Sequence, residues 1–64
     1  MTDEPARGDE NRIKAAELHA AALEAEARQD YKTAVESYEQ SLRLHDDPSV
    51  KAEYFKLLAT IGPM

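Results

Sequence analysis

Apolar residues in the middle of the chain recur at intervals of three and four, the spacing of one face of an α-helix. The clearest run consists of Tyr31, Ala34, Val35, Tyr38, Ser41 and Leu42. Asp30 precedes this run and can accept hydrogen bonds from the first free amides of a helix. Pro48 follows it, and proline cannot continue a helix but suits the first turn of the next one. The pattern therefore predicts a helix over about residues 31–45.

The segment before Asp30 predicts a longer helix over about residues 10–29, with Asp9 as its cap. It contains no Gly or Pro and consists mostly of the strongest helix formers. Its apolar positions form two adjoining stripes, and we expect a neighbouring helix to cover each stripe. The first stripe is Ile13, Ala16, Ala20, Leu23 and Ala27, and the second is Leu18, Ala21, Ala22 and Ala25.

A third helix is predicted over residues 48–61, with Asp47 as its cap and Gly62-Pro63 as its stop signal. Its expected inner face is Val50, Tyr54, Leu57 or Leu58, and Ile61. Phe55 lies about 100° around the helix from Tyr54. Either the helix is buried over a broad face, or Phe55 is exposed with Ala52 and Ala59 as a self-association patch.

These elements predict an all-α fold, an antiparallel helical hairpin followed by a third, capping helix, because no alternating run indicates a strand. We expect this domain over residues 9–62 and a disordered lead over residues 1–8, where Pro5, Gly8 and acidic residues offer little to bury. A chain of 64 residues buries little core. The lack of cysteine excludes disulfides and thiolate zinc sites. We therefore expect a homodimer or an obligate hetero-complex.

The formal charge of -5 and the pI of about 4.8 argue against nucleic acid, since Lys and Arg supply most of the affinity for phosphates. No run approaches the roughly 20 apolar residues that span a bilayer. The start of the chain has no basic segment followed by an apolar run, so it does not resemble a signal peptide. We therefore expect a cytoplasmic protein that binds neither nucleic acid nor membrane.

Candidate chemistry is sparse along the chain. His19 and His45 have no histidine or carboxylate three or four positions away on the same helix, as a helical metal site requires. His45 suits the C-terminal end of a helix dipole, and His19 suits a helix surface. No nucleophile stands in a catalytic setting, and the glycines lie near the chain ends. We expect no metal, no cofactor and no enzymatic activity.

The segment from about Ala15 to Pro48 resembles a tetratricopeptide repeat, a helix-turn-helix of 34 residues. The resemblance is carried by Asp30-Tyr31 at the turn, Ala34 and Ser41 at small positions, and Tyr38 at an aromatic position. The first helix departs from the pattern at Leu18, Ala21, Ala22 and Ala25, where the family has tryptophan, leucine, glycine and tyrosine.

A second resemblance is to the microtubule-interacting and trafficking domain, a three-helix bundle that binds short helical peptides. It is carried by Leu18, Ala22, Glu24, Asp30-Tyr31, Ala34, Tyr38 and Leu42. In that family the second helix is normally longer than Pro48 permits here. Both resemblances remain open on the sequence alone.

Either resemblance implies a non-catalytic adaptor that binds a peptide or a partner helix. The tetratricopeptide pattern implies that Ala16, His19, Leu23 and Glu26 line the binding groove. A rival hypothesis is a small structural or regulatory subunit of a larger enzyme complex. Self-association is a third expectation, with Leu44, Phe55 and Ala59 packing across a two-fold axis.

Overall fold

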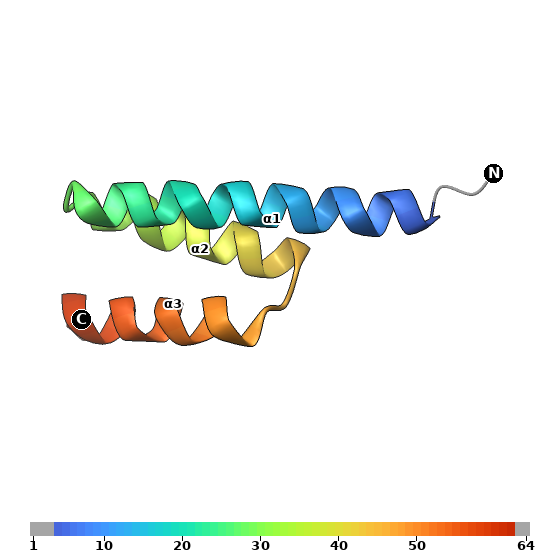
Figure 1. Cartoon of the computed structure of the whole chain (residues 1–64). Coiled ribbons are helices and arrows are strands. Elements are labelled where there is room, and N and C mark those ends of the chain that lie inside the picture. The colour runs from blue at the N-terminus through green and yellow to red at the C-terminus, as the bar shows by residue number, and fades with distance from the viewer. Residues whose placement is uncertain (1–3, 63–64) are drawn as a thin grey trace.

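The computed structural model describes the backbone of residues 4–62 and the side chains of residues 9–62. This part of the chain forms three helices: α1 (Glu4–Ala27), α2 (Tyr31–Leu44) and α3 (Pro48–Ile61). Successive helices run in opposite directions, so α1 and α3 run parallel to each other, and the two turns lie at opposite ends of α2 (Figure 1). The predicted all-α fold, a hairpin plus a third helix, is confirmed.

Helix α1 begins at Glu4, before the start predicted at about residue 10. Pro5 lies in the first turn, where the missing amide costs no helical hydrogen bond. Gly8 costs about 1 kcal/mol in a helix without breaking it. The backbone of residues 4–8 is thus helical where the composition predicts a disordered lead, and residues 1–3 lie outside the described residues. Asp9 is inside the helix and not its cap, and it accepts a hydrogen bond of 3.0 Å from Arg12.

The two turns have the caps that the sequence predicts. α1 ends two residues early because Gln29 adopts a left-handed φ of 66° and the Asp30 amide donates to the Ala25 carbonyl at 2.8 Å, a Schellman-type ending. The Asp30 side chain accepts a bond of 3.4 Å from the Thr33 amide. The Asp47 side chain accepts one of 2.9 Å from the Ser49 amide. Both aspartates therefore act as N-caps.

Small residues bring α1 and α2 close together. Ala15, Ala22 and Ala25 of α1 are buried, as is Ala34 of α2. Ser41 is also buried, and its hydroxyl donates to the Ala15 carbonyl at 2.8 Å. A side chain that bonds to the backbone of the facing helix fixes the register of the antiparallel pair.

Helix α3 packs mainly on α2 and makes only slight contact with α1. Val50 and Leu57 form its buried face, and Tyr54 is half-buried against the same core. Of the alternatives Leu57 and Leu58, Leu57 is therefore the inner residue and Leu58 is exposed, and Ile61, expected on the inner face, is exposed as well. Tyr38 of α2 is 1% exposed and lies at the centre of the core.

Because α3 lies against α2, only one apolar stripe of α1 is covered. Ala22 and Ala25 of the second stripe are buried and Leu18 is half-buried, while Ala21 is exposed. All residues of the first stripe are exposed, and we call this surface the apolar stripe: Ile13, Ala16, Ala20, Leu23 and Ala27. The expectation that each stripe has a neighbouring helix is therefore wrong for the apolar stripe within the described chain.

Candidate partner-binding surface

A polar cluster joins the three helices beside the apolar stripe. The Tyr38 hydroxyl donates to Glu26 Oε1 at 3.1 Å and lies 3.5 Å from Glu53 Oε1. His19 Nε2 lies 2.7 Å from the same Glu53 oxygen, and its ring centroid is 5.9 Å from that of Tyr38. The cluster thus links α1 to α3, which otherwise touch little.

Tyr38 acts in this cluster as a neutral donor. Burial raises the pKa of Tyr38 far above its ordinary value, and the hydrogen bond and charge of Glu26 and the nearby charge of Glu53 add to the effect. A hydroxyl has one hydrogen, so it can donate to only one carboxylate at a time. The arrangement is suited to positioning the glutamates and not to proton transfer near neutral pH.

Tyr54 makes a second bond between helices on the other side of the core. Its hydroxyl donates to Glu39 Oε2 at 2.9 Å, and this hydrogen bond, followed by burial, raises the pKa of Tyr54. Glu39 of α2 is therefore hydrogen-bonded to α3.

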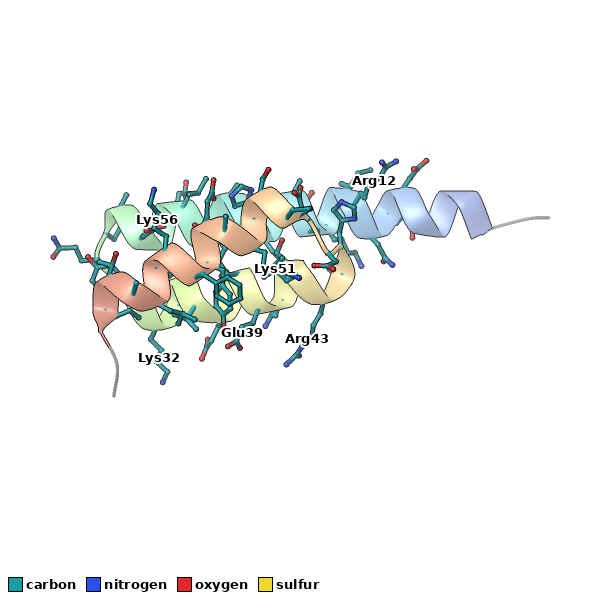
Figure 2. All side chains as sticks on the ribbon, turned by 90° about the horizontal axis from the view of Figure 1, so that it is seen from below. Arg12, Lys32, Glu39, Arg43, Lys51 and Lys56 are labelled. Carbon is teal, nitrogen blue, oxygen red and sulfur yellow. The ribbon has the colours of Figure 1, made fainter. Side chains whose placement is uncertain are left out.

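The labelled charged side chains lie on two sides of the molecule. Lys32, Glu39 and Arg43 point to one side, whereas Arg12 and Lys56 point to the opposite side (Figure 2).

A small pocket lies at the end of the cluster, between α1 and the connection from α2 to α3. Its apolar lining includes Val50, and its polar lining consists of Arg12, His19, Ser41, His45 and Asp47. Its volume of about 90 Å³ is well below the roughly 300 Å³ of the smallest usual ligand sites. It can hold a few waters or one partner side chain.

The four residues predicted to bind a partner lie along one side of α1. His19 and Glu26 belong to the polar cluster, and Ala16 lines the pocket with His19. Leu23 is 46% exposed and occupies the position between His19 and Glu26. Along this side of α1 the structure therefore places two hydrogen-bonded polar side chains, those of His19 and Glu26, next to an exposed apolar surface.

Sequence reasoning missed two members of the cluster. Tyr38 is predicted as a core residue, which its burial confirms, but its hydroxyl contacts could not be read from helical spacing. Glu53 carries no local signal, because it meets His19 only through the placement of α3 on α2. A glutamate on the α1 side of the third helix is recognisable only once that placement is known.

The three residues predicted for self-association do not share one helix. Phe55 is 57% exposed, and its ring is tilted by 38° to that of Tyr54 with 5.6 Å between the ring centroids. Ala59 is exposed one turn further along α3. Leu44 is half-buried at the end of α2. Of the two alternatives for Phe55, the structure shows the exposed one.

Comparisons with known proteins add nothing to this geometry: no family model, no curated protein and no solved structure matches the chain. Over the described side chains, no three histidine or acidic residues gather where they could hold a metal ion. None of the described helices combines the length and apolar character needed to cross a membrane.

Proposed function

We propose that this protein is a non-catalytic interaction module that binds a peptide or partner helix along α1. The observation that carries the proposal is the apolar stripe, which stays exposed over about four turns of helix. Its two large residues, Ile13 and Leu23, are 57% and 46% exposed. A partner that covers the exposed half of each side chain would gain about 1 kcal/mol of binding free energy per residue.

The predicted binding residues have distinct roles in this proposal. Ala16 leaves room for a partner side chain at the pocket, and Leu23 supplies apolar contact. His19 and Glu26 offer polar groups whose positions are held by Glu53 and Tyr38. The resemblance to a tetratricopeptide repeat supports the same assignment, and the three-helix bundle of the microtubule-interacting and trafficking domain is the alternative architecture.

Two neighbouring alanines give a matched test of the binding face. Ala20 is in the middle of the apolar stripe, and Ala21 is exposed on the adjacent polar side of α1. A20E and A21E add the same charge to the same helix one residue apart. The probes are three synthetic amphipathic helical peptides with the same leucine face and with lysine, glutamine or glutamate on the flanks.

Fluorescence anisotropy of labelled peptides should show that at least one of the three binds the native chain. A20E should weaken that binding at least tenfold, because it places a carboxylate against an apolar surface. A21E should change it less than twofold. Binding that A20E leaves intact would rule out the proposed face, and so would the absence of both probe binding and a dimer that A20E dissociates.

A second candidate function is a small structural or regulatory subunit of a larger enzyme complex, and it is favoured by exposed apolar residues on α3. Phe55, Leu58 and Ile61 are exposed on α3, away from the apolar stripe. Two apolar surfaces on a chain this small fit a subunit that packs against more than one neighbour. Light scattering and circular dichroism over a dilution series should then show helix lost on dilution, or little helix at all concentrations.

A further inference from the structure

Acidic residues follow the outer edge of the apolar stripe, on the side away from the polar cluster. Glu17 and Glu24 are seven residues apart and each follows a stripe residue directly, so they line up along the helix. Glu10 continues the spacing by another two turns. We call Glu10, Glu17 and Glu24 the acidic row, and all three are exposed.

The negative charge of the acidic row is only weakly neutralised by basic residues of the same chain. Glu24 pairs with Arg28 at 3.7 Å, but both side chains are about three-quarters exposed, and such pairs are worth little. Glu17 forms no ion pair with any described side chain, although Lys14 lies one turn before it. The outer edge of the stripe therefore keeps negative charge available to a partner.

The inner edge of the stripe differs because it carries charged groups of both signs. Arg12 pairs with Asp9 at 3.0 Å, and His19 lies against Glu53. Lys56 of α3 points to the same side of the molecule as Arg12 (Figure 2). Glu26 and Glu53 also lie on this edge, bonded to Tyr38 and His19, so the inner edge mixes acidic and basic side chains. The outer edge carries the acidic row, and a partner's basic residues therefore fit best along the outer edge.

The shape of the stripe also selects the partner. Three of its five residues are alanines, which leave shallow holes for large side chains of a facing helix. A second copy of α1 in parallel would place alanine against alanine and leave these holes empty. An antiparallel copy would place Ile13 and Leu23 opposite alanines, but it would bring Glu17 against Glu24 of the copy.

We propose that the partner of this face is an amphipathic helix with large aliphatic residues on its apolar side and lysine or arginine along one flank. The inference rests on the proposed function and names the chemistry of the partner. The basic flank lies against the acidic row, and the aliphatic residues fill the spaces over Ala16, Ala20 and Ala27. A net charge of -5 on the chain favours the same partner at long range.

The test uses the lysine-flanked, glutamine-flanked and glutamate-flanked peptides with the same leucine face. The lysine peptide should bind at least tenfold more tightly than the glutamate peptide in 0.1 M salt, and the ratio should shrink at higher salt. E17K should weaken binding of the lysine peptide about threefold to fivefold and improve binding of the glutamate peptide. E36K makes the same charge change at an exposed position of α2 and should alter neither affinity by more than twofold.

The outcomes separate this inference from the proposed function. Equal binding of the three peptides, lost in A20E, would overturn the basic partner and leave the binding face standing. An equal effect of E17K and E36K would also overturn it, because the attraction would then follow net charge alone. No binding of any peptide, together with a dimer that A20E dissociates, would replace the basic helix by a second copy of the chain. Absence of both binding and dimer would end both proposals.

Discussion

Raising the pH above 10 should destabilise this protein through Tyr38, the buried donor of the polar cluster. Its pKa is raised mainly by burial and then by Glu26. Above pH 10 the unfolded chain loses the tyrosine proton while the folded chain keeps it, so the unfolded state binds fewer protons. Stability therefore decreases with rising pH, by up to about 1.4 kcal/mol per pH unit for one group.

Integrated from neutral pH to pH 11, Tyr38 alone should remove about 1.4 kcal/mol, a large part of the stability of a small domain. Tyr54 acts with the same sign, because its pKa is also raised, through the Glu39 hydrogen bond. Its contribution is smaller, since its ring is only half-buried. Below about pH 9 neither tyrosine makes stability depend on pH, because both states then keep the tyrosine proton.

The assay is urea unfolding followed by circular dichroism at pH 8, 10 and 11 for the native chain and for Y38F. Phenylalanine keeps the ring in the core and removes the ionisable hydroxyl, so Y38F should lose clearly less stability between pH 8 and 11. A pH titration of tyrosinate absorbance in the folded protein gives an independent measure, and Tyr38 should be the last tyrosine to ionise. Equal losses in both chains, or ionisation of all tyrosines together near pH 10, would refute the argument.

Three further outcomes are expected. A34L should lower the unfolding free energy by about 1–3 kcal/mol in a thermal melt, because the buried alanine has no space for a larger side chain, while A21L at an exposed position should change it by less than about 0.5 kcal/mol. H19A should cost about 0.5–1 kcal/mol, because it removes the partner of the part-exposed Glu53, and hydrogen exchange should quicken in α3 more than in α2. E26Q keeps a hydrogen-bond acceptor for the Tyr38 hydroxyl, so the melting temperature should stay unchanged while the affinity for the peptide changes. A lowered melting temperature would show instead that the charge of Glu26 stabilises the fold.

Local features of the sequence predict the helices well, whereas contacts between residues far apart in the sequence could not be predicted. Asp30 and Asp47 mark their helix starts because a cap depends only on residues within one turn. The predicted start of α1 is wrong for a related reason. Pro5 and Gly8 are residues that commonly interrupt helices, yet a proline in the first turn fits a helix. These errors concern single positions and leave the order of elements intact.

The candidate site is only half predictable. His19 and Glu26 fall on the predicted line because the spacing of three and four residues places them on one side of α1. Their partner Glu53 depends on how α3 lies on α2, which no periodicity in α3 determines. The same placement decides that the apolar stripe stays open, since a third helix shifted toward α1 would cover it.

The distribution of large and small side chains on α1 separates the side that packs in the fold from the side that we propose for binding. The buried side consists of alanines, which let α2 approach closely but each remove little apolar area from water. The large aliphatic residues Ile13 and Leu23 are on the opposite, open side. Replacing them should therefore affect the fold little, whereas covering them adds stability only when a partner is present, by mass action. A partner at a hundred times its dissociation constant would stabilise the fold by about 2.7 kcal/mol, so occupancy of this face should be visible as a rise in melting temperature.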